Sequence, residues 1–140
     1  GDIDHFKKVN DTYGHIQGDM VLKQVGQILS DSMRSVFDVA GRYGGEEFCL
    51  IFDETDQKSA FQIVERLRNK VENYQFSKVD KTGTIKENAF IQITMSFGIA
   101  QYTRDSDITS ATDWIARADE ALYLSKQNGR NRTSIYKKEA

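Results

Sequence analysis

The chain has 140 residues, of which 39% are hydrophobic and 29% are charged. This size and mixture predict one globular domain whose core is large enough to fold without disulfides or a structural metal. The formal net charge of −2 gives no overall field for nucleic acid or an anionic membrane, and no apolar run is long enough to span a bilayer. We therefore expect no nucleic-acid partner and no membrane contact by this segment.

The first half of the chain is predicted to contain a helix followed by a hairpin. Apolar residues recur three or four positions apart over residues 18–33, which is the spacing of an amphipathic helix. Two β-prone runs, residues 39–43 and 48–52, flank Gly44-Gly45, so they are expected to form a hairpin whose turn uses positive φ angles. The single cysteine, Cys49, excludes an internal disulfide and is expected to be a small core residue, which fits a reducing cytoplasm.

The second half continues the alternation of helices and strands. The helical spacing returns between Ala60 and Val71, with Asp56 or Ser59 as the N-cap. A polar, exposed hairpin is expected around residues 76–86, and every odd position from 91 to 99 is apolar, which predicts one strand over residues 90–99 with a single buried face. A third helix is expected over residues 112–128, with Gly129 just past its end and a last strand over residues 133–136. Helices packed on a largely antiparallel sheet make this an α+β fold.

Two acidic clusters stand out, one at Asp2 and Asp4 and the other at Glu46-Glu47, directly after the two glycines. Each could simply be a solvated strand end, since surface acids are common. However, the glycines allow a ligand to approach the backbone, and carboxylates gathered at one sheet edge repel each other unless a cation offsets their charge. Carboxylate ligands select hard ions such as Mg²⁺ or Mn²⁺, which often work together with substrate phosphates.

At this point the sequence resembles the GGDEF domain, the diguanylate cyclase family. The resemblance rests on ordered blocks that cover almost the whole chain. They are Asp2-Ile3-Asp4-His5-Phe6-Lys7-Lys8-Val9-Asn10-Asp11, Gly14-His15, Gly18-Asp19, Arg42-Tyr43-Gly44-Gly45-Glu46-Glu47-Phe48, Met95-Ser96-Phe97-Gly98-Ile99-Ala100, Ala118-Asp119-Glu120-Ala121-Leu122-Tyr123, Lys126 and Gly129-Arg130-Asn131.

The resemblance implies the ferredoxin-like core of nucleotidyl cyclases and polymerase palm domains, a mostly antiparallel sheet flanked by helices. It assigns residues 1–140 to one GGDEF domain. It also places the family's first helix and most of its first strand ahead of Asp2, so the chain is expected to be an N-terminally truncated form of that domain.

The resemblance also implies the metal site and the catalytic acids. Asp2, the backbone carbonyl of Ile3, and Glu46 match the metal-binding positions, with two Mg²⁺ or Mn²⁺ ions per active site. Glu47 matches an acidic position assigned to metal binding or to deprotonation of the attacking hydroxyl, so Glu46 and Glu47 are the candidate catalytic residues. For Asp4, a structural hydrogen bond is at least as good an interpretation as a role in the site.

The substrate-binding positions follow in the same way. Asn10 and Asp19 match the guanine-binding pair, which is chemically sensible because a carboxylate accepts both N1–H and the exocyclic amine of guanine. Without the resemblance, Asp19 could equally be a helix N-cap. Gly44 and Gly45 leave room for a triphosphate, and three cations match the positions that meet phosphates, namely Lys7, Lys126 and Arg130.

The family reaction condenses two GTP molecules into cyclic di-GMP with loss of pyrophosphate, at an interface between two domains that each bind one GTP. The chain is therefore expected to be a cytoplasmic diguanylate cyclase that works as a homodimer; whether a parent protein is anchored to a membrane by other domains stays open. The alternative is an inactive GGDEF domain that binds GTP or cyclic di-GMP as a regulatory module. A cyclase that makes another cyclic nucleotide is a more distant rival, which Asn10 and Asp19 argue against.

One family motif does not align. Many members have an Arg-x-x-Asp inhibitory site, and this chain has Asp38 at the acidic position but Ser35 at the arginine position, with Arg34 one residue earlier. If the segment were helical, that shift would turn Arg34 about 100° away from the side of Asp38. The inhibitory site is therefore expected to be absent.

Overall fold

A five-stranded sheet forms the centre of the computed structural model, which describes residues 1–139. Its strand order is β2-β3-β1-β6-β7, and a separate two-stranded sheet consists of β4 and β5. Neighbouring strands are antiparallel, except that β6 and β7 are parallel. The strands are β1 (Asp2–Ile3), β2 (Asp38–Gly44), β3 (Glu47–Phe52), β4 (Phe76–Val79), β5 (Ile85–Ile91), β6 (Met95–Ile99) and β7 (Thr133–Ile135).

Helices cover both faces of the central sheet. Met95, Phe97 and Ile99 of β6 are buried in the core that α2 and α3 share. Gly98 faces the other way, where an added Cβ would collide with the backbone of α4 at Ala118 and Leu122. Because successive residues of a strand point to opposite faces, α4 lies across the sheet from α2 and α3. The helices are α1 (Phe6–Tyr13), α2 (His15–Asp31), α3 (Gln57–Glu72) and α4 (Ala111–Gln127).

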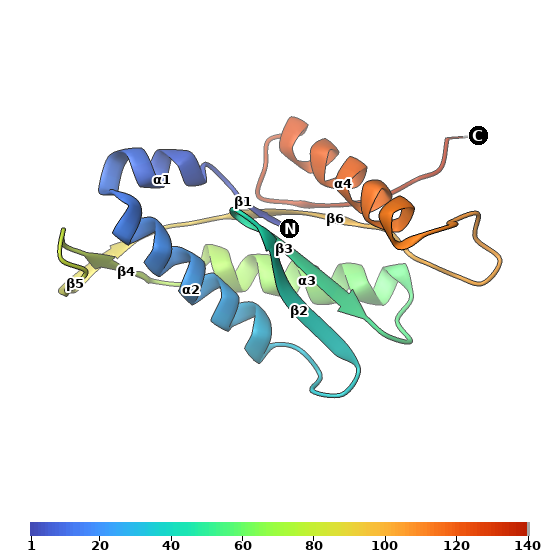
Figure 1. The fold of residues 1–140 in the computed structure, drawn as a ribbon, viewed down its shortest axis with the longest axis horizontal. Helices are drawn as coiled ribbons and strands as arrows, with labels where there is room; N and C mark the ends of the chain where they lie inside the picture. Colours follow the sequence, from blue (N-terminus) through green and yellow to red (C-terminus); the bar gives the residue numbers. More distant parts are fainter. Residues whose placement is uncertain (140) are drawn as a thin grey trace.

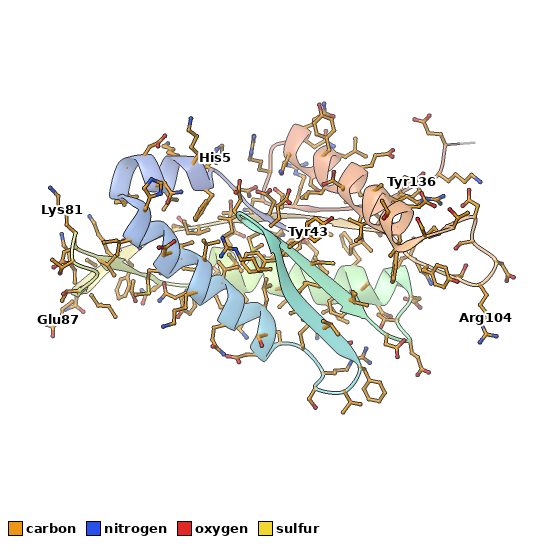
Figure 2. The ribbon with its side chains drawn as sticks, viewed as in Figure 1. His5, Tyr43, Lys81, Glu87, Arg104 and Tyr136 are labelled. Carbon is orange, nitrogen blue, oxygen red and sulfur yellow. The ribbon has the colours of Figure 1, made fainter. Side chains whose placement is uncertain are left out.

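The molecule is elongated, with the β4–β5 hairpin at one end and the loop between β6 and α4 at the other (Figure 1). The β4–β5 hairpin projects beyond the start of α2, with Lys81 and Glu87 near its tip (Figure 2). The buried side chain of Gln17 in α2 attaches this hairpin, because its amide donates to the Ser77 carbonyl at 2.9 Å and accepts from the Val79 amide at 2.9 Å. Arg104 lies at the opposite end, in the loop between β6 and α4. Within residues 1–139, none of the helices combines the length and the apolar character needed to cross a bilayer.

The α+β fold class is confirmed, and so are most of the predicted elements. Asp56 rather than Ser59 caps α3, since its carboxylate accepts from the Ser59 amide at 2.7 Å. Gly129 follows the end of α4 with a φ of 111°, as predicted for a residue just past a helix. In the Gly44-Gly45 turn only Gly45 has a positive φ, of 49°. Cys49 is half-buried in β3, not fully inside the core as predicted.

The prediction of one strand over residues 90–99 is wrong. The segment is divided between β5, which ends at Ile91 and pairs with β4, and β6, which begins at Met95 and pairs with β1 and β7. Ile93, in the break between them, is 4% exposed, so the alternation of buried side chains continues while the backbone changes partner. The hairpin before it is also less polar than predicted, because Phe76 and Val79 are buried.

Helix α1 was not predicted, and α2 begins earlier than the predicted residue 18. The whole of α1 and the first residues of α2 lie in the polar segment after β1. Helix α1 has only eight residues, of which Phe6, Val9 and Tyr13 are apolar and only Val9 is buried, so its helical spacing is too short to stand out in the sequence. Gly14, with a φ of 90°, separates α1 from α2. Asp19 consequently lies inside α2, and its interpretation as an N-cap is wrong.

Candidate active site

The predicted acidic residues meet where β1 pairs with β3. Asp2 lies directly opposite Glu47, and the Ile3 amide donates to the Glu46 carbonyl at 3.2 Å. On the other side of β1, Asp2 faces Ser96 of β6. The strand pairing therefore brings Asp2, Ile3, Glu46 and Glu47 to one end of the sheet.

Asp2 is a buried carboxylate with one cationic partner. Burial raises the pKa of the Asp2 carboxyl group, and this is the largest effect. The hydrogen bond and the charge of Lys126 lower that pKa, while the negative charges of Glu46 and Glu47 raise it. The net shift of the pKa is upward. The Lys126 Nζ donates to Asp2 Oδ2 at 3.0 Å. Among residues 1–139, no three or more His, Cys, Asp or Glu side chains are grouped so that they could hold a metal ion. The donors are nevertheless those that a hard divalent cation prefers, in a place where excess negative charge needs an offset.

The turn between β2 and β3 is open to a ligand. A Cβ added at Gly44 or Gly45 would meet no atom within 4 Å. Arg42 fixes the turn from within, because its Nε donates to the Gly45 carbonyl at 2.8 Å. Tyr43 is exposed beside the turn and lies close to β1 in projection (Figure 2). This backbone therefore has the space that a phosphate chain needs for close approach.

The predicted guanine-binding pair lies on α1 and α2. Asn10 is half-buried in α1, and a Cβ at Gly18 of α2 would collide with its Oδ1, so the glycine permits this close approach of the two helices. Asp19 follows Gly18 and is exposed. It lines a hollow of about 420 Å³ between α2 and β2 that also includes Leu22 and Arg42. Lys7 is exposed on α1, and among the described residues it makes no hydrogen bond or ion pair with the acids of the β1–β3 end, whereas Lys126 bonds to Asp2.

A second hollow, of about 550 Å³, opens between β3, α3, β6 and α4. Apolar side chains such as Phe97 and Trp114 contribute to its lining, and none of the predicted site residues does. Because none of the predicted site residues lines this hollow, it is not the candidate active site.

The comparisons with known proteins agree with this geometry. The family model described as "Diguanylate cyclase, GGDEF domain" matches residues 1–132. The chain belongs to this family. It is 42% identical over 136 residues to Diguanylate cyclase A of Treponema denticola and 35% identical over 136 residues to Diguanylate cyclase DosC of Escherichia coli. The match covers 97% of this chain in both cases, but only 34% and 27% of those two relatives.

Solved GGDEF structures are also similar. The GGDEF domain of DgcB from Caulobacter crescentus, crystallised with c-di-GMP, superposes with a TM-score of 0.82 at 34% identity, covering 96% of this chain and 74% of that one. The active GGEEF domain of a Vibrio cholerae diguanylate cyclase has a TM-score of 0.77 at 33% identity, covering 99% of this chain and 80% of that one. The chain thus has the fold of these GGDEF domains, and it spans about a third or less of the length of the curated relatives named above.

The structure corrects one argument about the GGDEF inhibitory motif. The segment between α2 and β2 is not helical at Arg34, and Arg34 does not point away from Asp38. Its Nε and Nη2 donate to the two carboxylate oxygens of Asp38 at 3.0 and 2.7 Å. Loop geometry thus restores a contact that the one-residue shift was expected to remove.

Sequence reasoning missed a polar cluster beside the candidate active site. Asp4 is only 6% exposed and accepts hydrogen bonds from Thr94, Ser96 and the Asn131 amide, which confirms its structural role. Arg68 of α3 contacts the side chain of Asn131. The sequence indicates Asn131 only as part of a family motif. Arg68 has no signal in the sequence, because a helical arginine is usually solvated.

Proposed function

We propose that the protein condenses two GTP molecules into cyclic di-GMP and releases two pyrophosphates. The observation that supports this most directly is the pairing of Asp2 with Glu47, beside an open Gly44-Gly45 turn. In each half-reaction the 3′-hydroxyl oxygen of one GTP attacks the α-phosphorus of the other, and the bond to pyrophosphate breaks. The proton of the hydroxyl leaves as the new phosphodiester forms, and Glu47 helps to accept it.

Asp2, Glu46, Glu47 and the carbonyl of Ile3 would hold Mg²⁺ or Mn²⁺. The metal, when bound, supplies positive charge that stabilises the developing charge on the phosphoryl oxygens. The protein itself positions the nucleotides: Asn10 and Asp19 bind guanine, while Lys7, Lys126 and Arg130 bind phosphates around the glycine turn. Asp19 favours guanine over adenine because adenine lacks the pair of donors that one carboxylate can accept.

The test is to incubate the protein with GTP and Mg²⁺ and to identify the products by mass spectrometry. Glu46→Ala and Glu47→Ala should each lower turnover by at least about two orders of magnitude, as expected when a group that stabilises the transition state is lost. Glu54→Ala is the matched control, because Glu54 is an exposed acid beyond the other end of β3. Normal cyclic di-GMP synthesis by both active-site variants would contradict the proposal.

The proposed reaction needs two domains, because each contributes one GTP. Specific activity should therefore rise with protein concentration until the dimer is saturated. A constant specific activity down to concentrations at which sedimentation shows only monomer would contradict the dimer requirement. GTP or cyclic di-GMP binding without turnover, in the same product assay, would favour a regulatory module instead.

A further inference from the structure

The turn between α4 and β7 has an unusual backbone. Gly129, Arg130 and Asn131 all have positive φ angles, of 111°, 63° and 45°. The left-handed region suits glycine, but consecutive side-chain-bearing residues are rarely held there unless the surrounding structure compensates. Arg130 and Asn131 are such a pair, and the hydrogen bonds around them supply the compensation.

Asn131 has hydrogen bonds on three sides. Its backbone amide donates to Asp4 Oδ2 at 3.0 Å. Its side-chain Oδ1 accepts from Arg68 Nη1 at 2.7 Å, and its Nδ2 donates to Glu72 Oε1 at 2.9 Å. Every polar group of the side chain is therefore bonded to α3, and the backbone is bonded to the segment that follows β1.

The groups that hold Asn131 are themselves fixed. Arg68 is 13% exposed at its side chain and also donates to Glu65 at 2.6 Å and to Glu72 at 3.0 Å. Asp4 is held by the hydroxyls of Thr94 and Ser96 at 2.8 and 2.6 Å. Asn131 thus joins two rigid parts of the fold across the turn.

The backbone of Arg130 is fixed within this turn, but its side chain is exposed and unpaired among residues 1–139. Its backbone amide donates to the Ser125 carbonyl at 2.9 Å. The guanidinium is exposed and makes no hydrogen bond or ion pair within the described part of the chain, residues 1–139. A guanidinium binds phosphate oxygens through two hydrogen bonds only when it has a defined orientation. A fixed backbone that carries an unpaired guanidinium is therefore the arrangement expected for binding an anion from outside the chain.

We propose that Asn131, through Arg68 and Asp4, is a positioning residue that fixes Arg130 for the triphosphate of GTP. This inference rests on the proposed function. Asp4 is two residues from Asp2, so the same hydrogen bonds set the phosphate-binding arginine at a fixed place relative to the acids of the metal site. Asn131 itself need not touch the nucleotide.

The experiment compares the affinities of 3′-deoxy-GTP, which lacks the attacking hydroxyl, and of GMP, measured by calorimetry with Mg²⁺. Asn131→Gly removes the side chain but tolerates the left-handed backbone, so the variant should fold. The affinity of this variant for 3′-deoxy-GTP should fall about tenfold or more, as expected for a lost charge-assisted contact, and the loss should be close to that in Arg130→Ala. Its affinity for GMP should change less than about twofold. In Arg130→Ala, the added Asn131→Gly should cause little further loss.

Two further variants complete the test. Asn88→Gly is the matched control, because Asn88 is an exposed asparagine with a φ of 53° in β5, and it should leave both affinities unchanged. Arg68→Lys keeps a positive charge between Glu65 and Glu72 but loses the planar fork that reaches Asn131. It should reproduce the selective loss of triphosphate affinity.

Suppose that Arg130→Ala weakens 3′-deoxy-GTP binding. The inference would then be overturned if Asn131→Gly lost no affinity for 3′-deoxy-GTP, or lost equal affinity for 3′-deoxy-GTP and GMP. It would also be overturned if the two losses of affinity multiplied in the double variant. If Arg130→Ala bound 3′-deoxy-GTP normally, the phosphate role of Arg130 would fall, and the inference with it. If the unmodified protein bound neither nucleotide, the proposed function itself would be contradicted.

Discussion

Asp4 shows how a single buried carboxylate can stabilise the structure around an active site. It accepts three hydrogen bonds, from the hydroxyls of Thr94 and Ser96 and from the Asn131 amide. Hydrogen bonds to a charged group are stronger than neutral ones, and their loss leaves buried donors without partners. Asp4 therefore connects β6 to the α4–β7 turn, beside the residues that we assign to catalysis.

We expect Asp4→Ala to lower the free energy of unfolding by about 3 kcal/mol, because the donors that remain, buried at Ser96 and half-buried at Thr94 and Asn131, lose their partner. Asp4→Asn should cost less, since the amide oxygen still accepts. Urea denaturation measures both effects, and Asp11→Ala, an exposed acid of α1, is the control, expected within about 0.5 kcal/mol of the unmodified protein. A change of that small size in Asp4→Ala would show that the cluster contributes little to stability.

At the scale of elements, the approach of α1 to α2 determines where Asn10 lies. An alanine in place of a mid-helix glycine usually stabilises a protein by up to about 1 kcal/mol. At Gly18, however, the added Cβ would collide with Asn10 Oδ1 and lie 3.1 Å from Phe6 Cζ. The helix pair therefore depends on the absence of a side chain at this position.

Gly18→Ala should displace the Asn10 side chain and raise the KM for GTP about tenfold, equivalent to about one hydrogen bond. Gly26→Ala on the same helix is the matched control, because its Cβ would meet only Phe48, at an ordinary 3.8 Å. That control should keep its KM and be equally or more stable. Steady-state kinetics decides between them, and equal KM values for Gly18→Ala and the unmodified protein would refute the role given to the α1–α2 approach.

The start of α3 gives a prediction about pH. The hydrogen bond from the Ser59 amide lowers the pKa of the Asp56 carboxyl group in the folded protein. A lowered folded pKa stabilises the protein above the unfolded value, near 4, and this stabilisation is lost as the pH falls through the folded pKa. Asp56→Ala should therefore destabilise the protein at pH 7 and have a smaller effect as the pH falls through the folded pKa of Asp56.

Asp56→Asn is the control for that titration, since an amide can cap the helix but does not ionise in this range. Thermal melts of the three proteins at pH 7 and at acid pH are the measurement. A difference between the unmodified protein and Asp56→Ala that stays constant over this range would contradict the assignment of the cap to an ionised carboxylate.

The elements also show which features a sequence can and cannot predict. Helices α2, α3 and α4 were predictable, because apolar residues recur at helical spacing in each of them. The β2–β3 hairpin was predictable because two β-prone runs flank Gly44-Gly45, although Phe48 is the only buried residue of the two strands. The division of residues 90–99 was not, because Ile91, Ile93 and Met95 stay buried while the backbone moves from one sheet to another. Helix α1 was missed for the opposite reason, since it has almost no buried face.

The candidate site divides in the same way. Positions that match a motif of the family, such as Asp2 and Glu47, could be named from the sequence, and the structure places them opposite each other. Contacts between residues that are far apart in the sequence could not be predicted from it. Arg68 reaches Asn131 across 63 residues, and no local pattern records that pair.

For the whole molecule, the contact between Arg34 and Asp38 bears on control by the product. Nη2 of Arg34 donates to the Asp53 carbonyl at 3.0 Å and to Thr55 Oγ1 at 3.1 Å, in addition to its bonds with Asp38. Nε is also occupied by Asp38. A phosphate that bound Arg34 through the same donors would have to displace these internal partners, and Ser35 provides no charge instead.

We therefore expect micromolar cyclic di-GMP to inhibit the enzyme weakly or not at all. Ser35→Arg should introduce inhibition, because it adds a guanidinium that is not already committed to Asp38, and such a fork can bind a phosphate through two hydrogen bonds. Gln62→Arg, which adds the same charge at an exposed position of α3, is the control and should not respond to the product. The measurement is the initial rate of synthesis over a range of added cyclic di-GMP. If the unmodified protein bound the product tightly outside the active site, and Asp38→Ala abolished that binding, then Arg34 would serve as the ligand in spite of its internal hydrogen bonds.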